Sequence, residues 1–225
     1  MAYPQLTNQG PLNKNYLKRI VETVYGALAI YPRLTVIRVD LRLPDNGAYS
    51  DNPLEHDAPM FFANISPNLI KRFIASLKAQ IEAEQYAKVR EGKRVHYCDT
   101  QHIWAREYSQ NHKSHYHLAL LFNKDRYHGL GSYAGYNSLA GKIRKAWASA
   151  LGMPIEECFT LVHFPENPVY HLNHNVPPKM FMSQLLPLLV RLSYLAKEKT
   201  KVYGTGQRNF GCSNSQNKWN QSNSF

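Results

Sequence analysis

The sequence predicts an α+β fold in which a central antiparallel sheet is covered by helices. Along the chain, segments with apolar residues at helical spacing, which predict helices, are interspersed with segments in which apolar and polar residues alternate, which predict strands. Two strand-like segments near the middle of the chain are joined by a short polar turn, which is typical of a β-hairpin. There is no internal repeat, and no linker divides the chain, so we expect a single domain.

The first two elements are a helix and a strand. Residues 13–30 have apolar side chains at helical spacing. Residues 33–43 alternate as a strand does, and this places Arg38 and Arg42 on one face. Residues 44–58 are rich in Pro, Asp, Asn and Gly, so we expect a loop there.

A second helix and the hairpin occupy the middle of the chain. Residues 66–87 begin with Ser-Pro and continue as one apolar stripe, which predicts a helix. Residues 94–107 and 115–122 are rich in aromatic and branched side chains and predict the two strands of the hairpin. Residues 108–114 form the polar turn between them.

The remainder of the chain predicts two more helices, a short strand and a tail. Helices are expected over 138–151 and 179–201, the second interrupted at Pro187. A strand is expected over 158–164. Residues 204–225 are rich in Asn, Ser and Gln and contain no acidic residue, so we expect a flexible polar tail.

The composition favours a protein that binds a polyanion. The chain has 27 Lys and Arg against 16 Asp and Glu, a formal net charge of +11, and nucleic acid is the commonest polyanion in cells. Its three cysteines lack C-x-x-C spacing, which argues against disulfides and against a cysteine-rich zinc site. We find neither a signal peptide nor an apolar stretch long enough to span a membrane, so we expect a cytoplasmic protein.

A histidine pair on the second strand of the hairpin is the first candidate site. Residues two apart on a strand face the same side, so His115 and His117 project together. Antiparallel pairing in the hairpin can bring Glu107 alongside them. Two imidazoles and a carboxylate suit Mg²⁺ or Mn²⁺ in phosphoryl chemistry better than a closed structural zinc site.

Structural explanations of the same residues remain open. The two histidines can be ordinary sheet residues, and a bare H-x-H pattern is more often that than a metal site. Glu107 can simply pair with Arg106 or Lys113. Asp40 and Asp99 are weaker candidates for the carboxylate ligand.

Tyr194 is a candidate nucleophile. In the predicted helix over 179–201 it lies opposite the leucine stripe, on the same side as Lys197 and Lys201. A phenol is a poor nucleophile near its free pKa of about 10, and a lysine three residues away favours the phenolate. The structural alternative is an exposed tyrosine on a basic, solvated face.

These residues together resemble the HUH endonuclease superfamily. Glu107, the triplet His-Tyr-His at 115–117 and the downstream Tyr194-x-x-Lys197 carry the resemblance. Within the superfamily the chain is most similar to the gene-two replication initiators of inoviruses (filamentous phages), which also occur in enterobacterial prophages. The matching stretches are RVDLRLP, REYSQNHKSHYHLALLFN, YLAKEKT and RNFGCS.

The resemblance implies rolling-circle initiation in a bacterial host cell. The protein would nick and rejoin single-stranded DNA at a phage origin through a 5′-phosphotyrosine on Tyr194, with Lys197 beside it. Mg²⁺ or Mn²⁺ would be held by Glu107, His115 and His117. The fold implied is a Rep-like variant of the ferredoxin-like sheet over residues 1–203, with an N-terminal helical extension. DNA would be the partner, together with host helicase and polymerase.

Two positions depart from the family pattern. Tyr116 is aromatic where aliphatic residues are common, and Glu198 stands where two-tyrosine initiators carry a second tyrosine. The chain therefore resembles a single-tyrosine enzyme, and this leaves strand closure unexplained. The alternatives are an HUH transposase or relaxase with another target, and a basic DNA-binding prophage protein without catalysis.

Several residues are candidates for binding the DNA itself. Four cations are expected to contact phosphates: Arg38, Arg42, Arg191 and Lys201. Three aromatic residues near the hairpin could stack bases: Tyr97, Trp104 and Tyr108. For Trp104, packing in the core is the favoured alternative.

Overall fold

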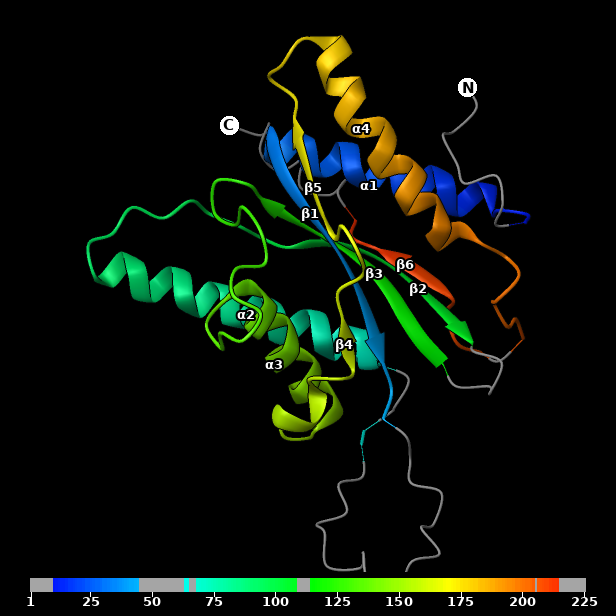
Figure 1. Ribbon diagram of the computed structural model, residues 1–225, viewed down its shortest axis with the longest axis horizontal. Coiled ribbons are helices and arrows are strands. Elements are labelled where there is room, and N and C mark those ends of the chain that lie inside the picture. Colours follow the sequence, from blue (N-terminus) through cyan, green and yellow to red (C-terminus); the bar gives the residue numbers. More distant parts are fainter. Residues whose placement is uncertain (1–9, 45–62, 65–67, 109–113, 205, 215–225) are drawn as a thin grey trace, which may run out of the picture.

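The computed structural model describes residues 10–44, 63–64, 68–108, 114–204 and 206–214 (Figure 1). Within these residues a six-stranded antiparallel sheet has helices on both faces, which confirms the predicted α+β class. Most of the predicted loop over 44–58, most of the turn over 108–114 and the end of the predicted tail lie outside the described residues. No helix among the described residues is long and apolar enough to cross a membrane.

The helices and strands have the following bounds. The helices are α1 (Lys14–Ile30), α2 (Leu69–Arg90), α3 (Leu139–Leu151) and α4 (Pro178–Ser193), with short 3-10 turns at η2 (Glu156–Cys158) and η3 (Tyr194–Ala196). The strands are β1 (Arg33–Arg42), β2 (Gln101–Tyr108), β3 (Ser114–Asn123), β4 (Val162–His163), β5 (Val169–Asn173) and β6 (Phe210–Cys212). Asn13 and Ser138 cap α1 and α3 by accepting hydrogen bonds from backbone N–H groups of the first turn.

The sheet has the strand order β4-β1-β3-β2-β6, and β5 pairs with β1 beside β4. The hairpin of β2 and β3 has the register that sets Glu107 directly opposite His115. On the other side of β3, Asp40 of β1 is opposite His117. Three neighbouring strands therefore present polar residues at the same end of the sheet.

Each face of the sheet is covered by its own pair of helices (Figure 1). On one face, α2 and α3 pack over residues such as Ile37, Leu118 and Phe122. On the other, α1 and α4 pack over residues such as Val36, Ala105 and Leu121. Because side chains alternate along a strand, Glu107, His115 and His117 belong to the α1 and α4 face, beyond the end of its apolar core.

Two strands were not predicted from the sequence. No strand was predicted over the segment that forms β5, and β6 lies in the stretch expected to be a flexible tail. That expectation is wrong for Phe210–Cys212, which pairs with β2. β2 itself begins at Gln101, seven residues later than predicted, and residues 93–100 form neither helix nor strand.

The last helix also ends earlier than predicted. α4 continues through Pro187 but stops at Ser193, and after the 3-10 turn η3 the backbone is extended at Lys197. Hydrogen bonds to the N-terminal segment hold it there. The N–H of Asn13 donates to the carbonyl of Ala196 at 2.8 Å, and the N–H of Glu198 donates to that of Pro11 at 3.1 Å. Lys197 and Lys201 are therefore not on a helical face with Tyr194.

Candidate metal centre and its tyrosine

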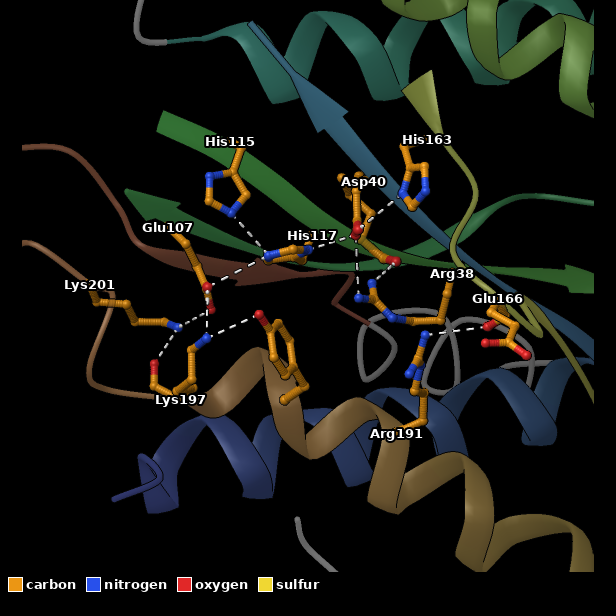
Figure 2. A network of polar contacts seen from close by, with 12 residues as sticks. Arg38, Asp40, Glu107, His115, His117, His163, Glu166, Arg191, Lys197 and Lys201 are labelled. Atoms are coloured by element: carbon orange, nitrogen blue, oxygen red, sulfur yellow. Dashed lines mark hydrogen bonds and ion pairs between the residues drawn. The ribbon is translucent and has the colours of Figure 1, made fainter. Parts of the chain in front are cut away.

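Glu107, His115 and His117 converge at the end of the sheet (Figure 2). One possible ligand atom from each lies within 4.8 Å of the other two. The Nε2 atoms of the two histidines are 3.1 Å apart, and Nε2 of His117 is 3.6 Å from Oε2 of Glu107. The strand period of two and the hairpin register together place the three residues as the sequence predicted. They form a candidate metal centre.

The state of Glu107 fits a cation site. Its side chain is 2% exposed, and its Oε1 lies 3.6 Å from the ammonium of Lys201. Burial alone would favour the protonated carboxyl, but His117 and Lys197 outweigh it and lower the pKa of Glu107 to about 2. A buried carboxylate that is ionised at neutral pH is a suitable ligand for a divalent cation.

Asp40 orients His117 from behind. Its Oδ1 lies 2.6 Å from Nδ1 of His117, so Nδ1–H donates to the carboxylate and the lone pair of Nε2 faces Glu107 and His115. His117 is buried, which lowers its pKa, but the bonds to Asp40 and Glu107 outweigh burial and the pKa is raised. A proton therefore competes with a metal ion for this nitrogen.

This arrangement corrects the role suggested for two acidic residues. Asp40 was a weaker candidate for a direct ligand, but it lies on the Nδ1 side of His117 and not among the three converging residues. Arg38 and His163 contact the same carboxylate, at 3.4 and 3.7 Å. Asp99 instead forms an ion pair with Lys78. No sequence signal indicated this role, because it depends on the pairing of β1 with β3 that sets Asp40 opposite His117.

We expect Asp40→Ala to weaken Mn²⁺ binding by about 10- to 100-fold, the usual cost of losing such an outer carboxylate. Asp40→Asn should cost less, because its amide oxygen can still accept the bond from Nδ1–H. Calorimetric titration with Mn²⁺ measures both. Asp125→Asn, which removes a carboxylate next to Arg33, is the control. Equal Mn²⁺ affinity in Asp40→Ala and the wild type would show that Asp40 does not orient the ligand.

Tyr194 lies against the candidate metal centre. Its ring is perpendicular to that of His117, with centroids 5.1 Å apart. Its hydroxyl accepts a hydrogen bond from Nζ of Lys197 at 3.0 Å, and the same Nζ is 3.2 Å from Oε2 of Glu107. Burial would lower the pKa of Lys197, but Tyr194 and Glu107 outweigh it and raise the pKa, so the ammonium persists. One cation thus links the phenol to the carboxylate.

The four predicted phosphate contacts separate into two pairs. Arg42 is exposed and lies opposite His115 in the sheet, and Arg191 is half-buried and lies near Arg38 (Figure 2). Arg38 is buried and donates to the carbonyl of Leu118. Lys201 is buried too, with Nζ 3.6 Å from Oε1 of Glu107. In this arrangement Arg38 and Lys201 contact the carboxylates of the site and do not face solvent.

Fold and site together define an α+β protein with a two-histidine, one-glutamate candidate metal centre next to a tyrosine–lysine pair. The chain belongs to the YagK/YfjJ C-terminal domain family, whose family model matches residues 2–213.

Two relatives come from Escherichia coli (strain K12), and both are described as uncharacterized. YagK is 46% identical over 186 residues, which cover 81% of this chain and 84% of YagK. YfjJ is 36% identical over 204 residues, which cover 88% of this chain and 93% of YfjJ. Among solved structures, this chain is similar to the N-terminal nuclease domain of minute virus of mice non-structural protein 1, and the match covers 89% of this chain and 79% of that nuclease chain. Its TM-score of 0.25 and identity of 10% are too low to carry an argument.

Proposed function

We propose that this protein is a metal-dependent endonuclease and strand transferase of the HUH type, which nicks and rejoins single-stranded DNA at a phage origin to initiate rolling-circle replication. The observation that carries the proposal is the convergence of Glu107, His115 and His117 next to Tyr194. Each of these residue types matches a role that strand transfer requires: an open metal site and a nucleophile with a cation beside it.

The three converging residues would hold Mg²⁺ or Mn²⁺, which supplies Lewis-acid polarisation of the scissile phosphate. The phenol oxygen of Tyr194 attacks the phosphorus, its proton leaves to solvent, and the bond from phosphorus to the 3′-oxygen breaks. The departing 3′-oxygen takes up a proton, and the 5′-phosphate stays on the tyrosine. The ammonium of Lys197, 3.0 Å from the phenol oxygen, stabilises the phenolate before attack.

The same site serves the reverse reaction. A 3′-hydroxyl attacks the phosphotyrosine, a phosphodiester forms and Tyr194 is released. Because one ester bond replaces another, rejoining needs no other energy source. Between the two steps the free 3′-hydroxyl is a primer for the host polymerase on DNA opened by the host helicase. The net charge of +11, with Arg42 and Arg191 next to the site, supports binding of the DNA backbone.

The test is formation of a covalent adduct. The protein is incubated with a single-stranded oligonucleotide that carries the origin of the phage genome encoding it, with Mn²⁺ or Mg²⁺, and analysed on a denaturing gel. We expect a metal-dependent adduct that chelator abolishes and that a scrambled oligonucleotide does not form. An adduct that forms on another DNA sequence but not on the phage origin would indicate a transposase or relaxase. Binding without any adduct in either metal would contradict the proposal.

A further inference from the structure

A cavity lies on the opposite face of the sheet from the candidate metal centre. It has a volume of about 620 Å³ and is enclosed by the start of α2 and the strands β2 and β6. Figure 1 shows β6 beside β2 at the edge of the sheet, with α2 across the face. Small-molecule pockets usually have volumes of about 300–1,000 Å³, so the cavity can hold a ligand of nucleotide size.

The lining of this cavity is cationic. It includes Lys71, Arg106 and Arg208 and contains no Asp or Glu. Lys71 and Arg208 are exposed, and within the described part of the chain no acidic residue forms an ion pair with either of them. Arg106 is buried behind them and donates to Oδ1 of Asn209 at 3.3 Å. Two exposed cations in a lining that contains no Asp or Glu favour an anionic ligand such as a phosphate.

An aromatic side chain completes the cavity. Trp104 is half-buried in its wall and packs edge to face with Tyr116, with ring centroids 6.2 Å apart. On another side of Trp104 the backbone of β6 lies close to the indole, since a Cβ on Gly211 would be 2.6 Å from its Nε1. Tyr116 and the glycine backbone thus fix the indole in place. A fixed aromatic ring beside cations suits a nucleobase attached to a phosphate.

We propose that this cavity binds one nucleotide, with its phosphate on Lys71 and Arg208 and its base against Trp104. The proposal goes beyond the nicking reaction and uses none of its residues. Arg106 and Tyr116 nevertheless alternate with Glu107 and His117 along β2 and β3. The cavity and the candidate metal centre therefore lie on opposite faces of the same ends of these two strands. The nucleotide is either part of a DNA strand or a free nucleotide, since both carry the same recognised groups.

The experiment compares two double variants of the full chain. Lys71→Gln with Arg208→Gln removes both phosphate contacts, and Lys18→Gln with Lys93→Gln removes the same charge from exposed positions elsewhere. The probes are fluorescein-labelled oligo(dT) and thymidine 5′-monophosphate, both in the presence of chelator. Loss of two contacts should reduce the slope of log affinity against log salt for oligo(dT) by about 1.4, at about 0.7 per contact. The control pair should leave the slope unchanged.

The two probes distinguish the sources of the nucleotide. Saturable binding of the monophosphate that the first double variant weakens assigns the cavity to a free nucleotide. A slope change for oligo(dT) without monophosphate binding assigns it to a DNA strand. Trp104→Leu should weaken whichever probe binds by at least about fivefold. Equal slopes for the two double variants, with no monophosphate binding that depends on Lys71 and Arg208, would overturn the proposal. Because chelator is present, these outcomes are independent of the adduct test.

Discussion

Replacing Tyr194 by Phe is expected to abolish the covalent protein–DNA adduct, with a loss of at least about 1,000-fold in its rate of formation. The bond between the phenol oxygen and phosphorus cannot form without that oxygen, and the metal centre alone supplies no attached nucleophile. The substitution should leave the fold intact. Within the described residues the hydroxyl bonds only to Lys197, and one such hydrogen bond contributes about 1 kcal/mol.

The matched control for this variant is Tyr203→Phe. Tyr203 is exposed and donates a hydrogen bond to Glu198, so it is a tyrosine close in sequence but with no place in the site. We expect wild-type adduct formation from it, and unchanged Mn²⁺ affinity in both variants. Adduct formation at the wild-type rate by Tyr194→Phe would assign the nucleophile to another residue and refute this part of the mechanism.

The elements that the sequence predicted well are those with strong local patterns. α1, β1 and β3 have long apolar repeats of a single period, and the tertiary structure agrees with them. The site triad followed from the same rule, because a period of two and one hairpin register are enough to bring Glu107 to His115. Geometry within two adjacent strands can be derived from sequence alone.

Other features depend on contacts between distant parts of the chain. β5 and β6 are short, and their pairing with β1 and β2 is what makes them strands. The segment after Ser193 is composed of good helix formers, yet hydrogen bonds to Pro11 and Asn13 hold it in another conformation. Asp40 could be placed behind His117 only once β1 was known to pair with β3. No local pattern contains that information.

Replacing Glu107 by Gln is expected to lower the free energy of unfolding by about 3–5 kcal/mol at pH 7, measured by urea denaturation in chelator. The reason is charge burial. Lys197 and Lys201 are each 8% exposed, and their ammonium groups lie 3.2 and 3.6 Å from the Glu107 carboxylate. Without that carboxylate two buried cations lose the acidic group that pairs with both of them among the described residues. The same variant should lose measurable Mn²⁺ binding, since it lacks one of three ligands.

The stability effect should depend on pH in a defined direction. The pKa of Glu107 is about 2 in the folded protein, against an ordinary value of 4.5. Because the folded pKa lies below the unfolded one, the stabilisation by Glu107 is complete above about pH 4.5 and is lost as the pH falls through about 2. The difference in unfolding free energy between wild type and Glu107→Gln should therefore shrink over this interval. A difference that stays constant down to pH 2 would contradict ionisation of Glu107.

A second substitution separates the two roles of Glu107. The side chain of Lys201 is fully buried, with its ammonium beside Oε1 of Glu107. Lys201→Met removes this ammonium and replaces it with an apolar side chain of similar length. Added to Glu107→Gln, it should restore a large part of the lost stability, because one of the two unpaired cations is gone. It should not restore Mn²⁺ binding, since the carboxylate ligand is still missing. Recovery of both properties would mean that Glu107 acts on the metal centre only by holding the fold around His115 and His117.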